Sequence, residues 1–182
     1  YRRKWEENFG PTDFSFNRGD VHYVCINNCF FHRGMAYYSP GELRERQVKW
    51  LKQDLALTPK DMKVVLCYHI PFTFGNAPFS KAKPLANANE QGHYSSSRLS
   101  LLLSLLKPFK GGYELFCGHT HFACNHEINY QGEDVMEHCH AAACGNIWQS
   151  NINICGTPNG YYVYSFVGTS ISNCYYKGTF WD

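Results

Sequence analysis

Polar and apolar residues alternate along two short runs near the start of the chain, residues 12–17 and residues 21–27, with Arg18 and Gly19 between them. A period of two is typical of strands that are buried on one face, and a short polar break between two such runs predicts a β-hairpin. We therefore expect the chain to start within a sheet.

The next apolar pattern has the spacing of a helix. Residues 39–42, with the sequence Ser-Pro-Gly-Glu, match a capping box that has proline at the first helical position. The residues that share one helical face after this box are Leu43, Gln47, Val48, Leu51 and Leu55. The sequence therefore predicts a helix over residues 40–57.

A strand, a helix and a second strand are expected next. Residues 63–68 form a continuous apolar run, which is typical of a strand covered on both faces. A stripe of leucines over residues 99–106, stopped before Pro108, predicts a helix, and residues 113–117 predict the second strand. Strands joined by a crossover helix lie parallel, so their C-terminal ends should meet at the edge of the sheet where chemistry is expected.

The rest of the chain is predicted to consist mostly of antiparallel strands. Residues 123–130 and 135–141 flank a polar turn, and residues 161–167 and 171–177 flank Gly168 and Thr169. Together with the parallel unit, these hairpins indicate an α/β fold of mixed, partly α+β character.

An Asn- and Gly-rich stretch over residues 145–160 is the best candidate for a boundary. We expect residues 1–144 to form one unit. Residues 145–182 should form an antiparallel β tail that packs on this unit or begins a further subdomain.

Composition narrows the class of protein. With 44% apolar and 18% charged residues among 182, the chain is expected to be globular. A formal net charge of +2 without clustered Lys and Arg argues against a nucleic-acid partner, and no apolar run is long enough for a membrane span. The chain begins with Tyr1 and lacks a signal-peptide pattern, so we expect a piece of a longer product. The nine cysteines are scattered singly along the chain, so the sequence predicts neither disulfide bonds nor a cellular compartment.

Histidines follow both strands of the predicted parallel unit. His69 comes directly after the first strand, and His119 and His121 come after the second, within the sequence Gly-His-Thr-His. Alternate residues of an extended segment point the same way, and Gly118 permits an unusual turn, so these imidazoles could face a common site. Imidazole is a common metal ligand, and the pattern predicts a metal site.

The order and spacing of these segments resemble the second half of the calcineurin-like metallophosphoesterases. The histidine-bearing segments are residues 63–71 and 118–121. The helix at residues 47–55 and the hairpin at residues 14–16 and 21–24 also resemble the corresponding elements of the family. The tail at residues 156–161 is similar to that of a bacterial subgroup.

This resemblance implies the C-terminal half of a sandwich of two mixed sheets flanked by helices. It also implies a metal-dependent phosphoester hydrolase, either a phosphomonoesterase or a phosphodiesterase, with a phosphoester as substrate. Members of this family use two divalent metal ions, for which we expect manganese, iron or zinc. Carried over by position, the resemblance makes His69 and His119 ligands of one ion and His121 a ligand of the other.

The motifs that the first half of the family's domain supplies are missing from this sequence. No Asp-x-His pair, Gly-Asp-x-x-Asp bridge or Gly-Asn-His segment is present at a strand end, and Asp20-Val21-His22 begins a strand instead of ending one. We therefore name no catalytic residue and no further cofactor-binding residue, and expect an incomplete metal site that is inactive in isolation. The expected partners are the missing N-terminal half of the same protein and, through an unpaired sheet edge, a second copy of the chain.

Two other interpretations use the same residues differently. A structural zinc cluster could be built from Cys117, His119, His121 and Cys124, or from His138, Cys139, His140 and Cys144, but no Cys-x-x-Cys knuckle supports it. His140 would be the first residue to add to the metal site. Alternatively, the aromatic antiparallel strands could form a non-catalytic module that binds a glycan or another ligand.

Overall fold

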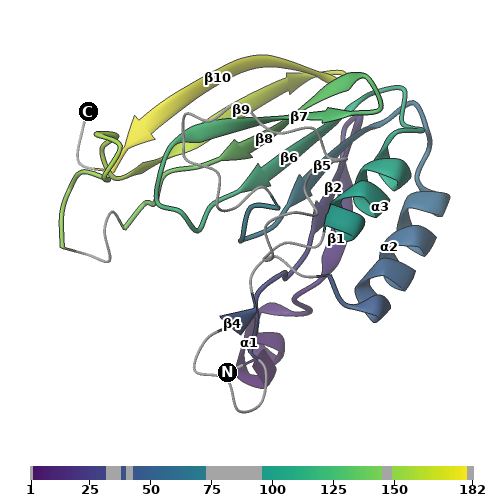
Figure 1. The fold of residues 1–182 in the computed structure, drawn as a ribbon, viewed down its shortest axis with the longest axis horizontal. Helices are drawn as coiled ribbons and strands as arrows, with labels where there is room; N and C mark the ends of the chain where they lie inside the picture. Colours follow the sequence, from purple (N-terminus) through teal and green to yellow (C-terminus); the bar gives the residue numbers. More distant parts are fainter. Residues whose placement is uncertain (1, 32–37, 40–42, 73–95, 145–148, 180–182) are drawn as a thin grey trace.

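The structure is a computed structural model that describes residues 2–31, 38–39, 43–72, 96–144 and 149–179 (Figure 1). In this part of the chain a mixed sheet of six strands has the order β1-β2-β5-β6-β8-β7. Its strands are β1 (Phe14–Arg18), β2 (Val21–Cys25), β5 (Lys63–Cys67), β6 (Tyr113–Cys117), β7 (Cys124–Tyr130) and β8 (Glu133–Cys139).

The inner strands β2, β5, β6 and β8 run parallel to one another, whereas β1 and β7 pair antiparallel at the two edges. The C-terminal ends of the inner strands therefore meet at one edge of the sheet. The segments that follow these strands are brought close together at that edge although they are far apart in the sequence.

One face of the sheet is covered by helix α2 (Glu45–Leu57) and helix α3 (Ser96–Leu106), which lie side by side in Figure 1. Alternate strand residues such as Val24, Val64 and Leu115 are buried against the leucines of these helices and form the core. This packing accounts for the apolar spacing seen in the sequence.

The opposite face carries a separate antiparallel hairpin of β9 (Gly160–Val167) and β10 (Ser170–Gly178) (Figure 1). Its aromatic residues pack on aromatic residues of the sheet, because Tyr164 stacks on Phe116 with ring centroids 4.6 Å apart and Phe166 meets Tyr23 edge-on at 6.3 Å. Among the described residues, this hairpin is the second β layer, while the division of the chain at residue 145 stays a prediction.

The expected mixed α/β class is confirmed, and so are the predicted N-terminal hairpin, the parallel strand–helix–strand unit and both later hairpins. Helix α1 (Arg2–Phe9) and the short pair β3 (Phe30–Phe31) and β4 (Tyr38–Ser39) were not predicted. None of the described helices is long and apolar enough to span a membrane.

The predicted start of the helix at residues 40–57, which is α2 in the structure, is wrong. Helix α2 begins at Glu45, and Leu43 and Arg44 are not helical, whereas residues 40–42 lie outside the described residues. The Oε1 atom of Gln47 accepts a hydrogen bond from the Arg44 amide at 2.9 Å, and Nε2 of Gln47 donates to Asp13 at 2.6 Å. A long-range contact therefore fixes the first turn at Arg44 instead of at the capping box seen in the sequence.

Candidate metal centre

His69, His119, His121 and His140 follow β5, β6 and β8, and all therefore lie near the C-terminal edge of the parallel strands. The amide of Gly118 donates to the carbonyl oxygen of His69 at 3.0 Å, so the two histidine-bearing segments remain paired beyond the ends of their strands. This backbone contact sets the spacing of the imidazoles.

His69 and His119 are brought into direct contact. The Nδ1 atom of His119 lies 3.1 Å from Nε2 of His69, and the two rings meet nearly perpendicular, at 77° with centroids 4.9 Å apart. Two nitrogens that each lie about 2.0–2.1 Å from one tetrahedral ion would be separated by roughly 3.3 Å. The pair therefore fits two ligands of a single metal ion.

The backbone of this loop differs from the extended segment that we expected. His119 has φ 69° and His121 has φ 60°, both in the left-handed region, and neither residue lies in a strand. The interpretation that simple alternation aims both histidines the same way is therefore wrong, and the unusual conformation lies at the histidines and not at Gly118. Such a conformation costs on the order of 1–3 kcal/mol per non-glycine residue and is often found at functional sites.

The environment of the paired imidazoles favours their neutral form. Burial lowers the pKa of His69, and the nearby charge of His121 lowers it further. Burial also lowers the pKa of His119, with additional contributions from His69 and His121. A metal ion binds the neutral ring, so both side chains are prepared for ligation near neutral pH.

Within the described residues, no group of three or more His, Cys, Asp or Glu side chains is arranged to hold a metal ion. His121 influences the other two histidines electrostatically, but it does not join their close pair in a single coordination geometry. The same observation gives no support to the two alternative zinc clusters. His138 is engaged elsewhere, with Glu114 at 3.3 Å and Asn125 at 2.9 Å.

His140 serves the packing of the hairpin. Its Nε2 atom lies 2.8 Å from the Tyr164 hydroxyl, and its ring stacks on Tyr162 at 4.8 Å. Burial lowers the pKa of His140 to about 4, with a further contribution from His138. These contacts place His140 between the sheet and the hairpin.

His22 lies at the other end of the sheet, near the start of β2. Its Nε2 atom lies 2.9 Å from Asp54 and its Nδ1 atom lies 2.5 Å from Asn17. Only 5% of the residue is exposed. The Asp-Val-His sequence is therefore part of the packing between β2 and α2.

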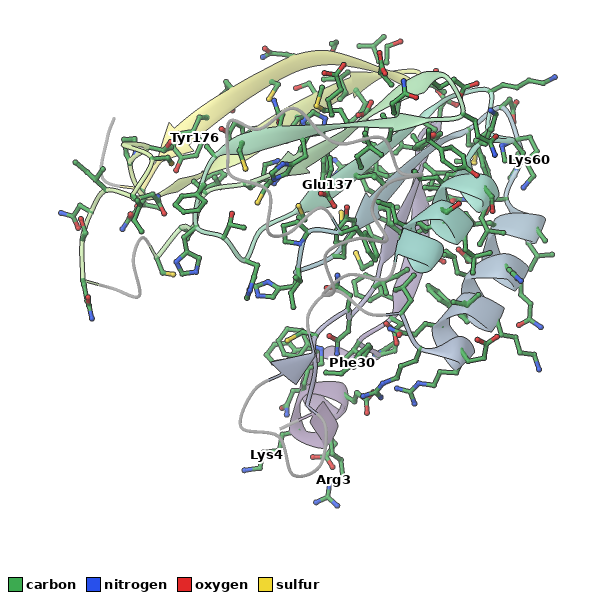
Figure 2. The ribbon with its side chains drawn as sticks, in the orientation of Figure 1. Arg3, Lys4, Phe30, Lys60, Glu137 and Tyr176 are labelled. Carbon is green, nitrogen blue, oxygen red and sulfur yellow. The ribbon has the colours of Figure 1, made fainter. Side chains whose placement is uncertain are left out.

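Two buried polar residues that sequence reasoning missed hold the His69 segment. The Oδ1 atom of Asn28 accepts hydrogen bonds from the amides of His69 and Ile70, each at 3.0 Å, and its Nδ2 atom donates to the Ile70 carbonyl at 2.7 Å. Glu137, 0% exposed, accepts from the Tyr68 hydroxyl at 2.5 Å and from the Phe72 amide at 2.8 Å. Figure 2 shows Glu137 in the interior of the molecule. The signal for these roles in the sequence is that each polar residue lies within an apolar segment.

A cleft of about 800 Å³ lies beside His69 and is lined in part by Trp5, Phe9 and Phe14. Its other described lining residues are Lys4, Asn8, Thr12 and Asn27. Aromatic walls with a few polar groups are typical of pockets that bind organic molecules.

Comparison with protein families gives a match in the C-terminal region. Residues 137–182 match the family model described as the C terminal of calcineurin-like phosphoesterase. This region of the chain is therefore similar to the C-terminal part of the calcineurin-like phosphoesterases, which confirms the resemblance found in the sequence. A comparison with curated proteins gave no match.

Proposed function

We propose that this chain is part of a metal-dependent phosphoester hydrolase, in which His69 and His119 hold one divalent ion and His121 contacts a second. The distance of 3.1 Å between the facing nitrogens of His69 and His119 is the observation that carries this proposal. The family match at residues 137–182 supports hydrolase chemistry on phosphoesters.

Divalent ions bound at this edge would act as Lewis acids on a phosphoryl group and stabilise its developing negative charge. The chain's own residues supply position and protonation state. Asn28 and Glu137 fix the His69 segment, and burial keeps His69 and His119 neutral. The cleft beside His69 offers space for the organic part of a phosphoester.

Neutral imidazoles provide no negative charge to offset two cations, and a bridging carboxylate is needed to hold two ions close together. We therefore propose that the carboxylate ligands come from an N-terminal half of the protein. Manganese, iron or zinc would suit such a mixed oxygen and nitrogen site. The isolated chain is expected to be inactive.

The alternative of a glycan-binding surface has weaker support. Tyr162 packs on His140 and Tyr176, and Tyr164 packs on Phe116, so these rings are engaged between the hairpin and the sheet. Tyr161 and Tyr175 are about half exposed, at 48% and 49%, but no stacking contact links them. Self-association through β1 or β7, the edge strands of the sheet, stays a prediction.

The proposal is tested by assaying hydrolysis of a chromogenic phosphomonoester and a chromogenic diester, with manganese or zinc added. The chain joined to its N-terminal half should be active, and His119→Ala should reduce its turnover at least about 100-fold, because a metal ligand is lost. His138→Ala is the matched control and should retain most of the activity. Equal turnover by the isolated chain and the longer protein would contradict the division of the site.

A further inference from the structure

Three cysteines lie side by side on neighbouring strands directly behind the histidine loop. Cys139 of β8 is the register partner of Cys117 on β6 and also of Cys124 on β7. Cys117 and Cys139 belong to the buried core on the helix-covered face, and Cys124 packs against that core. The three side chains therefore share one face of the sheet, with the Cys139 thiol in the middle.

The Cys139 thiol also contacts the backbone that presents His119. Its Sγ atom donates to the carbonyl oxygen of Gly118 at 3.0 Å and lies 3.0 Å from the Thr120 hydroxyl. Gly118 and Thr120 flank His119, whose backbone is held in the left-handed region. The thiol therefore stabilises a strained turn from both sides.

Cys124 is the member of the cluster that solvent can reach. Cys117 and Cys139 are buried, at 5% and 2% exposure, whereas Cys124 is partly exposed. Its Sγ atom lies 3.4 Å from Nε2 of His126. Reaction with a dissolved disulfide would therefore begin at Cys124.

We propose that Cys124 and Cys139 form a reversible disulfide by exchange with a low-molecular-weight disulfide such as oxidised glutathione, and that this bond releases the Gly118–Thr120 turn. Directly opposed residues of antiparallel strands have Cα atoms about 4.5–5.5 Å apart, which lies within the range that a disulfide bridges. Cys124 and Cys139 occupy such positions in the pairing of β7 with β8.

The exchange balances in two steps. In the first, the sulfur of Cys124 loses its proton and attacks one sulfur of oxidised glutathione, the sulfur–sulfur bond of glutathione breaks, and one glutathione leaves as a thiolate that takes up the proton lost by Cys124. In the second, the sulfur of Cys139 attacks Sγ of Cys124, the bond to the second glutathione breaks, and that glutathione leaves with the Cys139 proton. Two protein thiols are oxidised to one disulfide, and one glutathione disulfide is reduced to two thiols.

Oxidation removes the hydrogen that Cys139 donates to Gly118 and draws its sulfur towards Cys124. The turn then loses its support on both sides of His119. Where the proposed metal site holds, this should weaken metal binding by roughly 10-fold, as loss of an outer-shell contact commonly does. That consequence rests on the proposed function, whereas disulfide formation and release of the turn do not.

The test equilibrates the chain in glutathione buffers of increasing oxidised fraction. Peptide mapping by mass spectrometry should show a Cys124–Cys139 link that dithiothreitol reverses. Amide hydrogen exchange in the peptide containing residues 118–121 should become at least about threefold faster on oxidation. Cys124→Ser, with Cys124→Ala as a second variant, should abolish both changes, while the control Cys174→Ser on exposed β10 should preserve them.

Absence of the link in wild-type protein, or a link from Cys139 to Cys117 alone, would overturn the proposal. A Cys124–Cys139 link with unchanged exchange at residues 118–121 would overturn the release of the turn. Manganese titrations of the reduced and oxidised chain separate this inference from the proposed function. A reduced chain that binds no manganese, but still shows the link and the faster exchange, would refute the metal site and support the thiol proposal.

Discussion

The two histidine segments of the candidate site are supported in different ways. The segment after β5 is fixed by the buried side chains of Asn28 and Glu137, which bind its backbone at several points. The turn after β6 has left-handed residues at His119 and His121 and is held by the thiol of Cys139. One candidate ligand, His69, therefore lies on a segment fixed by buried hydrogen bonds, and the other, His119, lies on a strained turn with weaker support.

The largest effect should come from removing the buried carboxylate. Glu137→Ala would leave the Tyr68 hydroxyl and the Phe72 amide without their acceptor in the interior. We expect the free energy of unfolding to fall by about 2–4 kcal/mol, measured by urea denaturation. Glu127→Ala, at an exposed position of neighbouring β7, is the control and should change it by less than about 0.5 kcal/mol. Equal effects of the two variants would show that Glu137 does not hold the His69 segment.

Asn28→Ala should have the next largest effect. It removes three hydrogen bonds to the His69 segment, so we expect a loss of roughly 2–3 kcal/mol in the free energy of unfolding and weaker manganese binding in calorimetric titration. Asn129→Ala, which removes an exposed side-chain contact with Asp134, serves as the control. Wild-type metal binding by Asn28→Ala would show that these hydrogen bonds are irrelevant to the site.

At the strained turn, a glycine substitution should be less destabilising than an alanine substitution. His119→Gly relieves a left-handed backbone and should be about 1 kcal/mol more stable than His119→Ala in urea denaturation, while both variants lose metal binding. Gln131→Gly, at φ 53° in the turn between β7 and β8, should relieve similar strain without affecting metal binding. If the glycine and alanine variants of His119 were equally stable, the turn would not store strain.

The smallest effect concerns pH and lies away from the site. Burial alone would raise the pKa of Glu114, but hydrogen bonds from His138 and Lys63 outweigh burial and lower it below the usual 4.5. A carboxylate with a lowered pKa in the folded state stabilises the protein above its unfolded pKa, and this stability is lost as pH falls through the folded pKa. Thermal melts should therefore drop less between pH 6 and about pH 3.5 in Glu114→Gln than in wild type. Parallel curves would contradict the assignment.

Short-range patterns predicted most of the sheet. Strand β6 has the predicted bounds because residues 113–117, of which Leu115 and Cys117 are buried, lie between turn residues. The crossover rule correctly placed β5 beside this strand. Helix α1 was missed because its Trp5 and Phe9 are exposed, at 51% and 72%, and their rings lie 4.5 Å apart on the surface. The apolar pattern that identifies a packed helix is therefore absent there.

The same short-range patterns predicted only part of the candidate site. The parallel strands explain why His69 and His119 meet, although they are 50 residues apart. Asn28 and Glu137 reach the His69 segment across 41 and 65 residues, and their roles depend on tertiary packing that no local pattern contains. The left-handed backbone at His119 likewise lies between Gly118 and Thr120, both of which contact Cys139 from another strand.

The central claim is that His69 and His119 form one half of a metal centre. Its most direct test is calorimetric titration of the chain with zinc or manganese, repeated with His69→Ala, His119→Ala and the control His138→Ala. We predict one bound ion per chain, lost in both site variants and retained in the control. Undiminished binding by His69→Ala and His119→Ala, or equal loss in all three variants, would contradict the account.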